Sequence, residues 1–189
     1  YPNVSADSAD VYVKTHVRND YGADKSVSLK TEIIDADGIV VASETIPAQN
    51  ISAGSDHSFE QTITVSEPKL WDLDDPYLHD LVSTVYVDGM PVDTVTTRIG
   101  IRKIEMPRDY GLKINGVVQD MLNGVNRHQE YAYIGYAASD SLQRKDAMKF
   151  KEAGINVVRT AHYPASPEFL DACDELGILI IEPTPGWQW

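Results

Sequence analysis

The fold is decided by residues 139–182, which read SDSLQRKDAMKFKEAGINVVRTAHYPASPEFLDACDELGILIIE. Two amphipathic segments in this stretch predict helices at residues 140–153 and 167–176. A serine stands before each helix, and Gly154 and Gly177 follow, as expected for a residue just past a helix C-terminus. Each glycine leads into a short apolar run. The stretch therefore alternates helix and strand.

Three strands are expected around these helices, at residues 121–126, 155–159 and 178–182. A β-α-β-α-β order with short connections predicts a parallel sheet with right-handed crossovers. Three strands cannot close a barrel, so either a small open sheet is complete or a larger α/β domain has been cut. Trp187 and Trp189 favour the second alternative, because two indoles on a terminal tail are costly to expose.

The first hundred residues alternate apolar and polar side chains with a period of two, which is typical of half-buried strands. Turn sequences separate the runs, and Asp88-Gly89 fits a tight hairpin. About seven short antiparallel strands predict an all-β immunoglobulin-like sandwich. We place this sandwich at residues 1–105 and the α/β part at residues 106–189, where a small hairpin turning at Asn115-Gly116 comes first.

Composition excludes several classes of partner. The net charge of -13, from 16 basic and 29 acidic residues, repels phosphate backbones and anionic membranes, so no nucleic acid or membrane partner is expected. No apolar stretch approaches the roughly 20 residues that span a bilayer. The lone Cys173 forms neither a disulfide framework nor a two-cysteine metal site. No metal and no cofactor are predicted.

Polar side chains follow each predicted parallel strand, where barrel enzymes build their active sites. The first strand leads into Asn126, Arg127 and His128, the second into Arg159 and His162, and the third into Glu182 and Trp187. A purely structural alternative remains for each group. Arg127, Arg159 and Glu182 would then neutralise one another, the histidines would be core hydrogen-bonders, and the tryptophans would pack.

Two further features lie in the sandwich. His16, His57 and His79 have no partners at metal-ligand spacing and are interpreted as surface residues. The proline-bounded segment 68–78 predicts a rigid corner that buries Trp71 and Tyr77 against the sandwich core.

A set of short motifs in order resembles glycoside hydrolase family 2 over essentially the whole chain. The motifs are PKLW (68–71) with PYL (76–78), RIGIR (98–102), LKING (112–116), GVNRH (124–128), NVVRTAHYP (156–164) and CDELG (173–177). The resemblance implies an immunoglobulin-like sandwich followed by a partial α/β (TIM) barrel. Of this truncated barrel, the chain would contain the first three β/α units.

The resemblance implies retaining, exo-acting hydrolysis of a terminal β-glycoside by two carboxyl groups about 5–5.5 Å apart. Both belong to later barrel strands in the family, so no catalytic residue is expected in this chain, and the chain alone is predicted to be inactive. His128, His162, Asn126 and Trp187 are the implied substrate-binding residues, and Arg127, Arg159 and Glu182 their supporting shell.

The implied substrate is a β-galactoside-like carbohydrate, since Arg127 in place of Lys favours a galactosidase over a glucuronidase. The metal site of magnesium-dependent relatives has no counterpart in Pro185–Trp189. Self-association through the unclosed barrel is a further expectation. The competing class is a non-catalytic carbohydrate-binding or scaffolding module with a structural α/β appendage.

Overall fold

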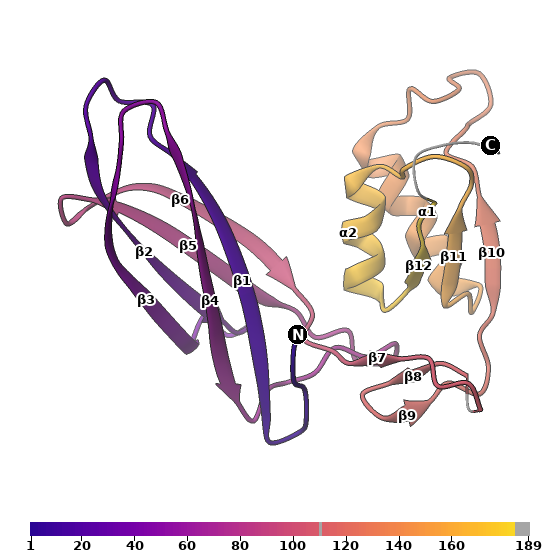
Figure 1. Cartoon of the computed structure of the whole chain (residues 1–189). Coiled ribbons are helices and arrows are strands. Elements are labelled where there is room, and N and C mark those ends of the chain that lie inside the picture. Colours follow the sequence, from indigo (N-terminus) through magenta and orange to yellow (C-terminus); the bar gives the residue numbers. More distant parts are fainter. Residues whose placement is uncertain (110, 184–189) are drawn as a thin grey trace. The chain divides into compact units, whose positions relative to one another are not determined.

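The computed structural model describes residues 1–109 and 111–183 (Figure 1). The chain forms two compact units. The first comprises Tyr1–Leu70 and Tyr77–Lys103, and the second comprises Trp71–Pro76 and Ile104–Trp189. The second unit therefore takes a short segment from between two strands of the first.

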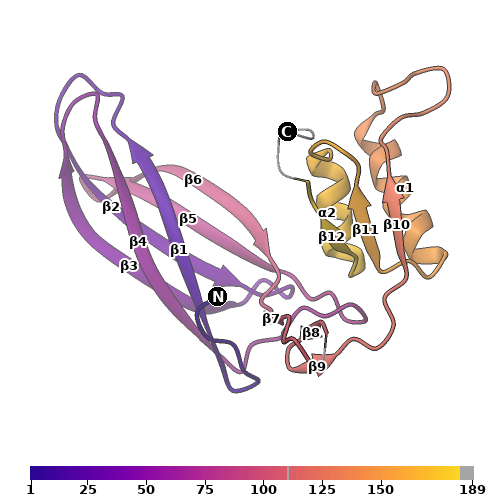
Figure 2. The same cartoon turned by 45° about the vertical axis from the view of Figure 1, so that its right-hand side comes forward.

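The first unit is a sandwich of two antiparallel sheets. One sheet has the two strands β1 and β4, and the other has four strands in the order β3-β2-β5-β6 (Figures 1 and 2). The strands are β1 (Ser8–Arg18), β2 (Lys25–Ile34), β3 (Val40–Ile51), β4 (Asp56–Ser66), β5 (His79–Val87) and β6 (Met90–Ile99). Asp88 and Gly89 both adopt positive φ, at 52° and 81°, and make the predicted tight turn between β5 and β6.

The core of this unit lies between the inner faces of the two sheets. Period-two alternation places every second residue of β1 and β4 inward, where Val11, Ile63 and Val65 pack with Ile33 of β2. A second apolar cluster includes Leu29 and Phe59. Six strands make up the sandwich in the part of the chain that is described, one fewer than the roughly seven expected for an immunoglobulin-like domain.

The second unit begins with a small three-stranded sheet and continues as β-α-β-α-β. The first sheet contains β7 (Ile104–Glu105), β8 (Lys113–Ile114) and β9 (Val117–Val118), and the chain then forms β10 (Gly124–Arg127), α1 (Asp140–Glu152), β11 (Val157–Thr160), α2 (Pro167–Leu176) and β12 (Leu179–Ile181). Asn115 and Gly116 have φ of 51° and 82°, so the predicted hairpin is confirmed. The strands β10, β11 and β12 pair in parallel, also as predicted.

Both helices pack on one face of the parallel sheet. Phe169 and Ala172 of α2 join Ala147 of α1 and Val158 of β11 in a single buried cluster. Arg144 of α1 forms ion pairs with Glu168 and Glu175 of α2, which adds a partly exposed polar link between the helices.

Trp71 is buried, but not where the sequence placed it. Its side chain is 1% exposed, yet it belongs to the second unit, where the indole N–H donates to the carbonyl oxygen of Asp174 in α2 at 2.7 Å. Lys151 of α1 donates to the carbonyl of Leu73 at 2.8 Å. The expectation that Trp71 fills the sandwich core is therefore wrong. The sequence pattern predicts that the Trp71 indole is buried, but it does not predict which of the two units buries it.

One of the three histidines interpreted as surface residues is buried. His16 is exposed and lies 2.6 Å from Asp56, and His57 is exposed as well. His79 is only 3% exposed and meets the edge of the Tyr77 ring at 4.9 Å between centroids. It is the first residue of β5, where Tyr77 before the strand covers it, and burial lowers the pKa of its imidazole.

Substitution of Gly177 tests whether the segment 71–76 is packed against α2. Its φ is +68°, and a Cβ built there would lie 2.2 Å from the carbonyl oxygen of Leu73. Gly154 has φ +75° with open space around it. We expect Gly154→Ala to lower the unfolding free energy by about 1 kcal/mol through backbone strain, and Gly177→Ala by about 3 kcal/mol through strain and overlap.

The measurement is urea unfolding followed by the helical circular dichroism signal, because both helices belong to the second unit. Equal losses for the two variants would mean that the backbone of Leu73 does not contact Gly177 in solution.

Candidate functional site

The candidate site begins with the register of the parallel sheet. Asn126 of β10 stands opposite Arg159 of β11, and Arg159 stands opposite Ile181 of β12. Parallel strands end at the same edge of a sheet, so the residues that follow β10 and β11 come out side by side. The register therefore brings the residues that follow β10 and β11 to one rim of the sheet, whereas Trp187 lies outside the described residues.

Alternation along the strands separates the candidates onto two faces. Val158 is buried in the cluster beneath the helices, with Val125 and Ile180 packed around it. Because side chains alternate along a strand, Asn126, Arg159 and Ile181 point to the opposite face. Ile181 is 55% exposed there. In the described part of the chain, this second face of the sheet has no helix over it (Figure 1).

His128 and His162 meet at the rim. Their ring centroids are 5.8 Å apart with the planes at 75°, and His128 also lies edge-on to Tyr163 at 6.1 Å. Arg159 approaches Nδ1 of His162 at 3.3 Å. A guanidinium carries only donors, so Nδ1 is the acceptor and the neutral ring keeps its proton on Nε2. The rim thus presents the ring nitrogens of two histidines next to the aromatic side chain of Tyr163.

Arg127 lies on the helix side of the sheet rather than at the rim. It is 5% exposed, its guanidinium lies 3.1 Å from the Asp146 carboxylate and bonds to Gln143, and its Cζ stands 4.0 Å from the centre of the Phe169 ring. A buried cation needs such a set of partners to offset its desolvation. Arg127 therefore holds α1 and α2 to β10, and this placement gives it no direct path to a ligand on the other face.

Glu182 holds the segment that joins β11 to α2. One carboxylate oxygen accepts from the Thr160 hydroxyl at 2.7 Å, and the other accepts from the Ala165 amide at 2.9 Å. The alternative in which Arg127, Arg159 and Glu182 neutralise one another does not match these contacts, since each of the three has a different partner.

Two residues that the sequence did not single out, Gln129 and Tyr136, complete the rim around Tyr163. The backbone N–H of Gln129 donates to the Tyr163 hydroxyl at 3.1 Å, and Gln129 Oε1 accepts from the Ser166 amide at 3.0 Å, so this side chain joins the loops after β10 and β11. Tyr136 lies edge-on to Tyr163 at 5.5 Å. Hydrogen bonding to Glu130, and then to Tyr163, raises the pKa of Tyr136. Gln129 directly follows His128 in the sequence, whereas no sequence signal pointed to Tyr136.

Other reactive groups contribute little chemistry. Burial raises the pKa of the Cys173 thiol to about 12, so it remains protonated and acts as a small apolar core residue. Across residues 1–109 and 111–183, no three His, Cys, Asp or Glu side chains gather where a metal ion could be held. No helix in that same part of the chain is long and apolar enough to cross a membrane.

Comparison with known proteins assigns both halves of the chain. The family described as Glycosyl hydrolases family 2 matches residues 1–102, and its TIM barrel domain matches residues 108–187. A β-galactosidase of Thermoanaerobacter pseudethanolicus is 39% identical over 159 residues, which are 84% of this chain and 21% of that protein. A β-glucuronidase of Formosa agariphila is 32% identical over 185 residues, or 96% of this chain and 18% of that protein. The chain thus spans about a fifth of the length of these relatives.

Solved structures agree in fold. β-Glucuronidase 2 of Bacteroides uniformis, covalently bound to cyclophellitol-6-carboxylate aziridine, superposes with a TM-score of 0.89 at 29% identity, covering 96% of this chain and 22% of that one. A family 2 member from Bacteroides cellulosilyticus gives 0.86 at 30% identity, covering 96% and 25%. With its sandwich and the start of a TIM barrel domain, the chain belongs to glycoside hydrolase family 2.

Proposed function

We propose that residues 1–189 are part of a retaining, exo-acting β-glycosidase of β-galactosidase type that hydrolyses terminal β-linked sugars. In this proposal β10, β11 and β12 are the first three strands of its (β/α)8 barrel, and the sandwich ends at residue 105. The observation that carries the proposal is the meeting of His128 and His162 at the carboxyl rim of a parallel sheet, which is where barrel enzymes bind substrate.

The open face of the sheet supports the idea of a larger barrel. Parallel strands are normally covered on both faces. Here one face carries α1 and α2, while Asn126, Arg159 and the exposed Ile181 share the other. Further strands closing a barrel would enclose that second face. For the isolated chain we propose self-association through this face, to be measured by sedimentation at several protein concentrations.

His128 and His162 are proposed to bind the sugar. A neutral imidazole has one donor nitrogen and one acceptor nitrogen, and a sugar hydroxyl can pair with either. Arg159 positions His162 by occupying its Nδ1, so Nε2–H is the group that donates. Asn126 on the same face and Trp187 beyond Glu182 are proposed as further contacts, the indole against the apolar face of the ring.

Arg127 and Glu182 are proposed to support this rim without touching the substrate. Arg127 fixes β10 against the helices through Asp146, and Glu182 fixes the loop after His162 through Ala165. Glu182 is therefore a poor candidate for a nucleophile or an acid/base, since both of its oxygens accept hydrogen bonds from the fold. Retaining hydrolysis needs a second carboxyl group about 5–5.5 Å from the first. We propose that later barrel strands supply both.

β-Galactosidase type is proposed over β-glucuronidase type on two grounds. Arg127 stands where the resemblance favours a galactosidase, and the relative with 39% identity is a β-galactosidase. The glucuronidases among the relatives make the other specificity the natural comparison. Turnover of aryl β-galactoside and aryl β-glucuronide by the longer polypeptide, measured side by side, distinguishes them, and a preference for the glucuronide would reverse the assignment.

The 189-residue chain alone is expected to be inactive. Release of the aryl group from aryl β-galactosides should not exceed the rate without enzyme, because neither catalytic carboxyl group is proposed to lie in this chain. The longer polypeptide, assayed in parallel, is the positive control. Turnover by the short chain would contradict the placement of the carboxyl groups on later strands.

Substitution of the two histidines tests the sugar site itself. In the longer polypeptide, His128→Ala and His162→Ala should each lower kcat/KM by about 10- to 100-fold, the effect of losing a hydrogen bond that strengthens in the transition state. His57→Ala, at an exposed position of the sandwich, is the matched control and should leave kcat/KM unchanged. If the histidine variants fold and keep full activity, His128 and His162 do not bind the substrate.

The same assay separates the enzyme from the competing class. A non-catalytic carbohydrate-binding module would bind a galactoside without hydrolysing it in the longer polypeptide. Loss of binding in His162→Ala with no turnover in any variant would favour that module.

A further inference from the structure

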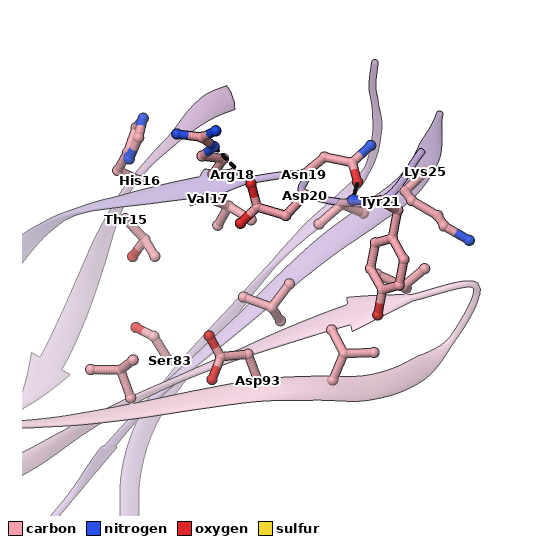
Figure 3. A pocket seen from close by; sticks show the side chains of 15 residues that line it. Thr15, His16, Val17, Arg18, Asn19, Asp20, Tyr21, Lys25, Ser83 and Asp93 are labelled. Atoms are coloured by element: carbon pink, nitrogen blue, oxygen red, sulfur yellow. Dashed lines mark hydrogen bonds and ion pairs between the residues drawn. The ribbon is translucent and has the colours of Figure 1, made fainter. Parts of the chain in front are cut away.

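A pocket of about 580 Å³ lies in the first unit, away from the rim histidines in the chain (Figure 3). Val85 and Val95 line it. In Figure 3 the Arg18 guanidinium turns to the carboxylate of Asp20, 2.8 Å away, so these two charged groups pair with each other. The pocket belongs to the unit that does not contain the rim histidines, and the proposed sugar site does not include it. Further residues that act on the sugar are therefore sought around the rim.

The two rim histidines lie where regular pairing of β10 and β11 ends. In the described part of the chain, the last backbone bond between these strands runs from the Ala161 amide to the carbonyl oxygen of Arg127 at 2.9 Å. The bonds of a parallel ladder are evenly spaced, so the next one would run from the Gln129 amide to the carbonyl oxygen of Ala161. The Gln129 amide donates instead to the hydroxyl of Tyr163, at 3.1 Å. A tyrosine hydroxyl thus replaces a backbone acceptor at the end of the sheet.

Each histidine stands between two residues that are bonded across the sheet. The neighbours of His128 are Arg127 and Gln129, and both bond to the chain that follows β11. The neighbours of His162 are likewise bonded to the β10 side. Both histidines are exposed, whereas Gln129 and Tyr163 are half-buried. The histidines are therefore open to a ligand, while the residues that follow them hold the loops together.

The Gln129 side chain adds a second link between the two loops. Its Oε1 accepts from the Ser166 amide at 3.0 Å, and Ser166 stands directly before α2. The loop after β11 is thus held to Gln129 at Tyr163, next to His162, and again at Ser166, where the loop ends. We call the two hydrogen bonds of Gln129, to Tyr163 and to Ser166, the rim clasp.

The ring of Tyr163 also reaches the other histidine. It lies edge-on to His128 at 6.1 Å between centroids, and Tyr136 lies edge-on to it at 5.5 Å. Tyr136 belongs to the same loop as Gln129, between β10 and α1. Because Tyr163 contacts His128 through its ring and is joined to His162 through its backbone, a movement of Tyr163 displaces both imidazoles.

We propose that Gln129 and Tyr163 are positioning residues of the sugar site, which set the spacing and orientation of His128 and His162 without touching the substrate. This inference rests on the proposed function, in which the two histidines bind the sugar. Imidazoles on different loops keep a fixed separation only if the loops are joined, and a displacement of about 1 Å can cost a reaction roughly 100-fold. The rim clasp joins the loops.

Two other roles for Tyr163 lead to different expectations. A hydroxyl that bonds the sugar directly would act independently of the histidines. A hydroxyl that only stabilises the fold would change the fraction of folded molecules and leave kcat and KM of the folded enzyme unchanged. The structure favours positioning, because the Tyr163 hydroxyl already accepts from the Gln129 amide and its ring already contacts His128.

The first test uses the longer polypeptide. Tyr163→Phe keeps the ring and removes the acceptor of the Gln129 amide, so kcat/KM should fall about tenfold, mostly in kcat, because the aligned histidine bonds strengthen in the transition state. Gln129→Ala should have a similar effect. Gln129→Glu should restore most of the activity, since a carboxylate oxygen still accepts from the Ser166 amide at the start of α2, where negative charge is favoured. Tyr21→Phe, at an exposed position of the sandwich, is the control and should change nothing.

A double-mutant cycle separates positioning from direct contact. In the background His128→Ala/His162→Ala, Tyr163→Phe should lower kcat/KM less than twofold, because no imidazole is left to position. The full tenfold loss in that background would mean that Tyr163 acts on the substrate or on folding, and it would overturn the proposal.

The geometry is measured in residues 1–189, without any need for turnover. In Tyr163→Phe the Gln129 amide should exchange with solvent about tenfold faster. The nuclear Overhauser effect between the ring protons of His128 and His162, whose centroids lie 5.8 Å apart, should weaken. If neither quantity changes, the hydroxyl does not hold the loops and the proposal is wrong. If the longer polypeptide hydrolyses no glycoside, the proposed function fails, whereas these two measurements still decide whether Gln129 and Tyr163 position the histidines.

Discussion

Parallel pairing of β10 with β11 is the interaction on which the candidate site depends. It places Asn126 beside Arg159, and it brings the chain out of both strands at the same edge, so that His128 and His162 meet with ring centroids 5.8 Å apart. An antiparallel pair would have sent these two histidines to opposite ends of the sheet. Their separation of 34 positions along the chain is therefore bridged by sheet topology and not by local structure.

Alternation across that sheet then divides the polar residues by task. Arg127 points toward the helices and is neutralised by Asp146, while its neighbours Asn126 and Arg159 point to the open face. A guanidinium that is buried with its partners contributes a fixed strand rather than a ligand contact. Glu182 likewise uses both oxygens to hold backbone and hydroxyl groups around the rim. The supporting residues Arg127 and Glu182 thus hold the fold around the site, and the two histidines are left to contact a ligand.

Much of this arrangement could be predicted from the sequence, since periodicity and the glycines after each helix indicated the β-α-β-α-β order, and the strand-end rule named His128 and His162. What the pattern could not decide was which core covers a buried side chain, as Trp71 shows by bonding to Asp174 in the second unit. The role of Gln129 was missed because it depends on the Tyr163 hydroxyl and the Ser166 amide, contacts that only the folded loops create. Residues 1–109 and 111–183 contribute six strands to the sandwich rather than about seven, because the expected number came from domain size rather than from the runs themselves.

In each unit taken by itself, one sheet face carries apolar side chains that no other layer in the described part of the chain covers. In the second unit the parallel sheet has one face covered by helices and Ile181 exposed on the other, and in the first unit the inner face of β6 exposes Val92 and Val95. Alternating apolar side chains stabilise a sheet only where another layer buries them. A sheet with regular inward apolar positions therefore specifies a partner for those positions.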